Sequence, residues 1–93
     1  MATFTVRVVL HDADWDDYND LYDEMQKEGF TDEIKSHDGI FYKMPDAEYD
    51  ISGSFTLSDV LSKAKKAASR TGREYAVFAT EALKRRWIGL ERV

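Results

Sequence analysis

The stretch FTVRVVLHDADWDDYNDLYDEM, residues 4–25, decides the fold because its hydrophobic period changes along its length. In residues 4–12 every second side chain is apolar, at Phe4, Val6, Val8 and Leu10. This period of two, with β-branched residues, predicts a strand that is covered on one face. From Trp15 onward the apolar residues are three and four positions apart, which predicts a helix over residues 15–28.

The ends of this helix carry capping signals. Asp14 is placed as the N-cap, Asp17 completes an approximate capping box, and Gly29 follows as a stop. The residues predicted to form its buried stripe are Trp15, Tyr18, Leu21, Tyr22 and Met25.

The remaining chain contains further strands and one more helix. Strands are predicted near residues 31–36 and 47–53, and IFYKM, residues 40–44, either extends the first of these or forms a short strand of its own. Residues 56–72 predict a helix with Thr56 as N-cap, Asp59 at the box position and Gly72 at its end. Its predicted buried stripe is Leu57, Val60, Leu61, Ala64 and Ala68.

The last part of the chain is predicted to complete the sheet. Residues 73–82 are apolar enough to predict a strand covered on both faces, and residues 83–93 predict a short helix or an added strand. The order β-α-β-β-α-β predicts a single domain, residues 1–93, with an α+β ferredoxin-like fold. In that fold two helices cover one face of a four-stranded antiparallel sheet. The other face is then open to solvent or buried in a homodimer.

Composition narrows the classes of function. The chain has no cysteine, which excludes disulfides and thiolate chemistry. It has no secretory signal and no apolar run of the ~18 residues that span a membrane, so we expect a cytoplasmic protein without membrane contact. Residues 1–50 carry 14 acidic and 4 basic residues, whereas residues 51–93 carry 4 acidic and 9 basic ones. Such a dipolar chain can meet partners of either charge.

The acidic stretch of residues 11–24 has three interpretations. Asp12, Asp14 and Asp16 have the spacing of calcium-loop ligands, but Asp17 stands where that loop needs glycine, which excludes an EF-hand. Capping and a solvated helix face explain most of the carboxylates. A surface that docks a basic protein partner is the alternative.

Two residues after the first strand are candidates for catalysis. Asp12 follows the strand directly, where its carboxylate can hold Mg²⁺ if a second copy of the chain adds another ligand. A loop aspartate that bonds its own backbone is the simpler interpretation. His11, like His37, precedes an aspartate and can act as a general base if a carboxylate fixes its tautomer; each also fits an ordinary turn.

Basic residues in the second half are candidates for phosphate contacts. Lys63, Lys66 and Arg70 share the exposed side of the second helix, which suits a nucleic-acid backbone but is also usual for a solvated helix. KRRW, residues 84–87, places an aromatic beside three cations, which suits nucleotide stacking, although Trp87 can instead close the core. The aromatic motif of RRM domains and the Gly-rich phosphate loop are both absent.

Several segments together resemble the GhoS family of antitoxins from type V toxin–antitoxin systems. They are FTVRVVLHDADW, LYDEM, DGIFYKMPDAEYDIS and SFTLSDVLSKAKKAA, within residues 4–82. The resemblance implies a ferredoxin-like endoribonuclease that cleaves the messenger of its partner toxin, with Asp12 near the family's aspartate after the first strand. The family's first helix bears an arginine linked to cleavage, whereas this helix has none.

Three functional hypotheses follow. The leading one is RNA binding or metal-assisted RNA cleavage in a toxin–antitoxin setting. In it Asp12 holds Mg²⁺, His11 assists, and Lys63, Lys66 and Arg70 hold the RNA backbone. The alternative is a non-enzymatic phage or regulatory module whose acidic half docks a basic protein. The third is a structural subunit of a larger assembly.

Overall fold

Five strands and two helices make up the chain in the computed structural model, which describes residues 1–93. In order they are β1 (Ala2–Leu10), α1 (Trp15–Lys27), β2 (Glu33–Lys35), β3 (Phe41–Lys43), β4 (Glu48–Gly53), α2 (Leu57–Ser69) and β5 (Tyr75–Glu81). The α+β class predicted from the sequence is confirmed. Neither helix has the length and apolar character needed to cross a membrane.

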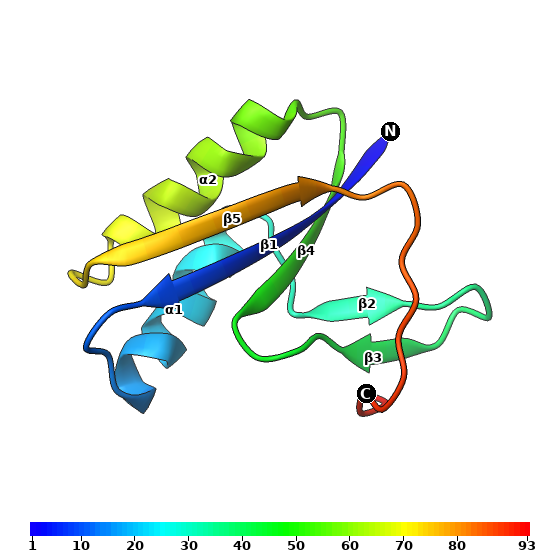
Figure 1. Ribbon diagram of the computed structural model, residues 1–93, viewed down its shortest axis with the longest axis horizontal. Helices are drawn as coiled ribbons and strands as arrows, with labels where there is room; N and C mark the ends of the chain where they lie inside the picture. Colours follow the sequence, from blue (N-terminus) through cyan, green and yellow to red (C-terminus); the bar gives the residue numbers. More distant parts are fainter.

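The strands form two sheets instead of the single four-stranded sheet that the sequence predicts. β1 lies at the centre of a three-stranded antiparallel sheet in the order β4-β1-β5, while β2 and β3 form a separate hairpin (Figure 1). Thr31 begins to pair with β4 through an isolated bridge to Asp50. The chain then bends, and the carbonyl oxygen of Asp32 accepts a hydrogen bond from the amide of Met44 at 2.7 Å. From Glu33 onward the backbone therefore pairs with β3 and no longer with β4.

The core lies between the three-stranded sheet and the two helices, which share one face of it (Figure 1). Phe4, Val6 and Val8 of β1 are completely buried there, whereas Arg7 on the opposite face is exposed. The predicted alternation of β1 is thus confirmed. The helices contribute the buried side chains Leu21, Met25, Val60, Ala64, Ala67 and Ala68.

Both helices begin with the predicted capping boxes. The Asp14 carboxylate accepts a hydrogen bond from the Asp17 amide at 3.0 Å, and the Asp17 carboxylate accepts one from the Asp14 amide at 3.1 Å. Thr56 and Asp59 make the same reciprocal pair. After α1, Gly29 has a φ of 96°, a left-handed conformation that favours glycine.

The predicted buried stripes are wrong at three positions. Trp15 is 78% exposed, and Leu57 and Leu61 are also exposed. Trp15 and Leu57 are the first residues of their helices, beyond the turns that pack on the sheet. On α2 the buried face is centred on alanines, including Ala67, whose small side chains allow the helix to approach the sheet closely.

β5 is an edge strand and is not covered on both faces as predicted. It pairs only with β1, and its exposed residues Ala76, Phe78 and Thr80 alternate with partly buried Tyr75, Val77 and Ala79. Phe78 is 72% exposed on the open face, opposite Arg7. An apolar run is therefore compatible with one solvated face when no second layer covers that face of the sheet.

Residues 83–93 form an extended tail that runs from the end of β5 towards β3 (Figure 1). They form no helix, and their pairing is limited to an isolated bridge between Tyr42 and Arg92. The Lys43 amide donates to the Glu91 carbonyl at 2.8 Å, and the Val93 amide donates to the Phe41 carbonyl at 2.9 Å. Of the two predicted alternatives, the tail is closer to an added strand.

Candidate functional site

The turn between β1 and α1 holds both residues predicted to be catalytic. His11 and Asp12 are exposed, and the His11 amide donates to the Glu74 carbonyl at 2.8 Å. Asp12 has a φ of 52°, in the left-handed region that aspartate tolerates better than most residues. The turn thus directs one imidazole and one carboxylate into solvent at the end of the sheet.

A metal site at Asp12 would need ligands from outside the chain. No group of three or more histidine or acidic side chains in the structure is placed to hold a metal ion. The Mg²⁺ site at Asp12, completed by a second copy, stays a prediction. His37 lies far along the chain, exposed in the β2–β3 turn, and is not part of the Asp12 turn.

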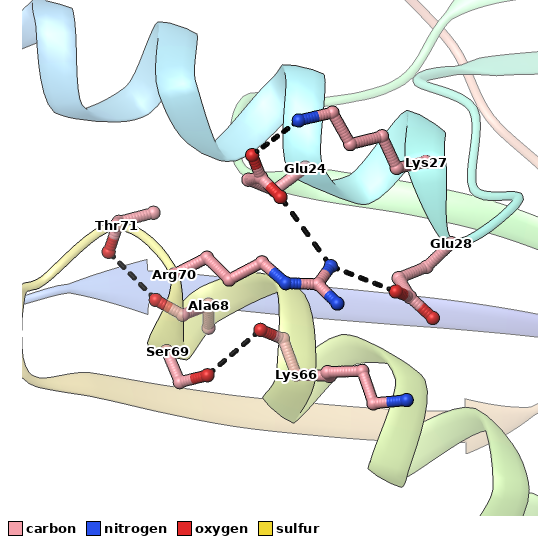
Figure 2. A network of polar contacts seen from close by, with 8 residues as sticks. All are labelled: Glu24, Lys27, Glu28, Lys66, Ala68, Ser69, Arg70 and Thr71. Carbon is pink, nitrogen blue, oxygen red and sulfur yellow. Dashed lines mark hydrogen bonds and ion pairs between the residues drawn. The ribbon is translucent and has the colours of Figure 1, made fainter.

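Ion pairs join the acidic helix α1 to the basic end of α2, a region we call the α1–α2 seam. Figure 2 shows Arg70 reaching between two carboxylates of α1, with its Nη1 atom 2.9 Å from Glu28 Oε2 and 3.5 Å from Glu24 Oε1. Arg73 Nε lies 2.9 Å from Asp17 Oδ2 in the same seam. Part of the charge asymmetry between the two halves of the chain is therefore balanced within the molecule.

Two carboxyl groups in the seam, those of Asp17 and Glu24, have a lowered pKa, and the largest cause in each case lies within α1 and its N-cap. The hydrogen bond from the Asp14 amide lowers the pKa of Asp17 below 3.8, and Arg73 lowers it further. The Lys27 ammonium, 2.8 Å away, lowers the pKa of Glu24 below 4.5, with a smaller contribution from Arg70. Asp17 and Glu24 are charged at neutral pH and pair with Arg73 and Arg70 across the seam.

The three cations predicted to bind RNA phosphates have different surroundings. Arg70 is held by the seam. Lys63 Nζ lies 5.2 Å from the centre of the Phe55 ring, within the range of a cation–π contact. Lys66 is exposed, and its side chain points away from the seam in Figure 2. The structure thus leaves two of these three cations without a carboxylate partner.

A second set of cations gathers in a hollow of about 600 Å³, which we call the basic groove. It lies between the β2–β3 turn and the start of the tail. Its charged and aromatic lining residues are Lys35, His37, Asp38, Lys84, Arg85, Arg86 and Trp87. Asp38 is its one acidic residue, so the hollow is strongly cationic.

The tail holds the basic groove in place through two contacts. Arg85 Nη1 donates to Asp50 Oδ1 at 2.7 Å and to Thr5 Oγ1 at 3.1 Å, on the open face of the sheet. Trp87 packs edge-to-face on Tyr42 with a centroid distance of 5.7 Å. Lys35, Lys84 and Arg86 take part in none of the ion pairs. Their charges are therefore available to a ligand.

A third region, which we call the acidic groove, is a hollow of about 1000 Å³ between α1, the β3–β4 connection and the end of the tail. Four aromatic side chains line it, namely Trp15, Tyr18, Tyr22 and Tyr49. Its carboxylates are Asp14, Asp32, Glu33, Asp46, Glu48 and Glu91, and its cations are Arg7, Lys43 and Arg92. Arg7 is paired with Glu48 at 4.0 Å.

Sequence reasoning found only part of these two grooves. It singled out residues 84–87 for stacking, but it did not identify Lys35 as a partner because that lysine lies in the acidic half. It placed Trp15 in the core, although its position directly after the N-cap was a signal that it could project from the sheet. Nothing in the sequence near Tyr49 indicates that it lies beside the tyrosines of α1.

No protein-family model matches this chain, and no curated protein matches it either. The resemblance to the GhoS family therefore stays a prediction.

Proposed function

We propose that this protein binds single-stranded RNA through the basic groove, in a toxin–antitoxin type system like that of the GhoS family it resembles. The observation that carries the proposal is the position of Lys84, Arg86 and Trp87 across one hollow from Lys35. None of the three cations has a carboxylate partner.

This combination suits single-stranded nucleic acid for two physical reasons. Unpaired cations attract the phosphate backbone, and binding releases its condensed counterions. An aromatic ring beside them offers a face on which a base can stack, worth ~1–3 kcal/mol per base. Three phosphate contacts predict that the logarithm of the affinity falls with the logarithm of salt concentration with a slope of about 2.

The proposal includes a ferredoxin-like relationship and a homodimer. The strand order β4-β1-β5 and the bridge from Thr31 to Asp50 agree with three strands of such a sheet and the beginning of a fourth. The exposed Phe78 on the open face is a candidate for a contact between two copies.

Cleavage by Asp12 and His11 is a separable part of the proposal. Thr5, which Arg85 contacts, and His11 lie towards opposite ends of β1, roughly 20 Å apart at the usual rise per strand residue. RNA bound in the basic groove would therefore have to extend beyond it along the protein to reach Asp12 of the same copy. Cleavage that persists in Asp12→Ala, at matched folding, would remove Asp12 from any role.

Fluorescence anisotropy with a labelled 12-nucleotide single-stranded RNA tests the binding proposal. We expect Lys84→Glu/Arg86→Glu to weaken binding at least tenfold. The matched variant Lys63→Glu/Lys66→Glu, with the same change in charge on α2, should weaken it much less. A larger loss in the α2 variant would move the RNA site to that helix. Equal affinity of both variants and the unmodified protein would reject RNA binding by these cations.

Tryptophan emission gives an independent measurement. In a Trp15→Phe variant, Trp87 is the one remaining tryptophan, since the chain has two. We expect saturable quenching on addition of RNA because a stacked base contacts the indole. Unchanged emission at saturating RNA would exclude stacking on Trp87.

A further inference from the structure

The acidic groove contains a tyrosine whose hydroxyl has no partner. Tyr49 is 5% exposed and lines the groove, yet its hydroxyl takes part in no hydrogen bond, and no side-chain nitrogen or oxygen is left fully buried and unpaired. The Tyr49 hydroxyl therefore reaches the surface of the groove.

The neighbouring tyrosines differ from it in this respect. Tyr18 donates to the Leu10 carbonyl at 3.3 Å and accepts from the Leu10 amide at 3.0 Å. The Tyr22 hydroxyl accepts from Gln26 Nε2 at 2.9 Å. Among the three phenols, only that of Tyr49 makes no hydrogen bond within the chain.

Negative charge surrounds these phenols. Burial, followed by the charge of Asp32, raises the pKa of Tyr49 from 10.0 to about 12. Burial, followed by the charges of Asp32, Glu33 and Asp23, also raises the pKa of Tyr22. Asp32 is thus close to both rings, and the electrostatic potential at this end of the groove favours a cation.

We infer that the acidic groove binds the arginine or lysine side chains of a basic polypeptide segment. Aromatic faces attract ammonium and guanidinium groups, the carboxylates of Asp32 and Glu33 neutralise their charge, and the Tyr49 hydroxyl accepts an N–H. A volume of about 1000 Å³ is at the upper end of ligand pockets and exceeds the space one side chain fills. A segment that presents several cations uses this space better than a single small cation.

The exposed stripe of α1 is a less specific surface for the same partner. Asp16, Asp20 and Asp23 are exposed and take part in no ion pair, but they do not line the groove. They contribute to a long-range negative field, which steers a basic partner without fixing its position. Lys43 and Arg92 also line the groove and repel a cationic ligand. A ligand must therefore place its positive charges beside the carboxylates and away from these two residues.

Titration of a Trp87→Phe variant, in which Trp15 is the sole tryptophan, tests the inference. The probe is a ten-residue peptide of alternating arginine and glycine, and the control peptide has glutamate in place of arginine. We expect a saturable change in Trp15 emission with the arginine peptide only, weakened at high salt. No saturable change at low salt would overturn the inference.

Variants distinguish groove binding from general attraction. Asp32→Asn/Glu33→Gln should weaken peptide binding at least tenfold, and Tyr49→Phe should weaken it several-fold with an unchanged melting temperature. Asp16→Asn/Asp20→Asn removes an equal number of negative charges, but from outside the groove, and should weaken peptide binding less than threefold. An equal loss in both charge variants would show a diffuse field and overturn the inference.

Two further measurements test whether the ligand is a polypeptide and whether the two grooves bind independently. Argininamide that binds as tightly as the peptide would overturn the choice of a polypeptide in favour of a small cation. RNA affinity of the Asp32→Asn/Glu33→Gln variant should equal that of the unmodified protein. The two proposals can therefore fail separately.

Discussion

The acidic and basic grooves each contain one of the two tryptophans, but they are built differently. The acidic groove has Tyr49, a member of the hydrophobic core, in its wall, and its helix α1 is anchored by the fully buried Leu21 and Met25. The basic groove lies between a hairpin of two three-residue strands and an extended tail. Arg85 and Trp87 provide its attachment. We conclude that the α1 and Tyr49 wall of the acidic groove is as stable as the core, whereas its opposite wall, formed by the hairpin and the tail, can open locally together with the basic groove.

The charges of the two grooves also show that halves of the sequence do not correspond to surfaces. Arg70 and Arg73 of the basic half are paired with carboxylates of α1. Lys35 of the acidic half joins the cations of the tail. The net charge of a segment therefore does not predict the partner of the surface it helps to form.

Removal of a core side chain under the acidic groove should have the largest effect. Leu21 is completely buried on α1, so Leu21→Ala should lower the free energy of unfolding by about 2–5 kcal/mol. Urea denaturation measures this change. Ile88→Ala in the tail, where the side chain is 96% exposed, is the control and should change stability by less than about 0.5 kcal/mol. Similar effects of the two variants would contradict the comparison.

Loss of the Arg85 contacts should act locally on the tail. Arg85→Ala removes the hydrogen bonds to Asp50 and Thr5, which we expect to cost about 1 kcal/mol after screening by solvent. Hydrogen exchange of the Lys43 and Val93 amides, which pair the tail with β3, should become faster while amides of α1 keep their protection. Arg86→Ala is the control. Uniform acceleration across the protein would show that the tail belongs to the core.

Acidification should lower the free energy of unfolding through the carboxylates of the α1–α2 seam. The folded-state pKa values of Asp17 and Glu24 lie below their ordinary values of 3.8 and 4.5, so their contribution is complete above those values and is lost as pH falls through the lowered ones. We expect the urea concentration at the unfolding midpoint to decrease as the pH is lowered below about 4. The decrease should be smaller in the Glu24→Gln variant. A midpoint independent of pH between 6 and 3 would contradict the role of the seam.

The smallest expected changes in stability come from two single substitutions on α1, Asp17→Asn and Asp20→Asn, which should differ from each other. Asp20 is exposed and unpaired, so Asp20→Asn should change stability by less than about 0.5 kcal/mol. Asp17→Asn should lower the urea midpoint measurably because it weakens both the capping box and the pair with Arg73. If the two variants have equal midpoints, the division of α1 into a paired and a free side is wrong.

Local features of this protein were determined by the sequence alone. The covered face of β1, both capping boxes and the stop at Gly29 follow from side chains within a few residues of one another. The capping boxes and the alternation of β1 depend on side chains that are close in the sequence, whereas the extent of the buried helix stripes and the covering of β5 did not follow from period alone. Asp12 lies directly after the first strand, as expected, because that position also depends on residues close in the sequence.

The tertiary structure alone decided the rest. The bend at Asp32 divides the sheet, and the absence of a layer on the open face leaves Phe78 exposed. The grooves bring Lys35 beside Lys84 and Tyr49 beside Tyr22, residues that are distant in the chain. Such contacts depend on how whole elements pack, because the free energy of burial and ion pairing is shared among segments that no local pattern connects.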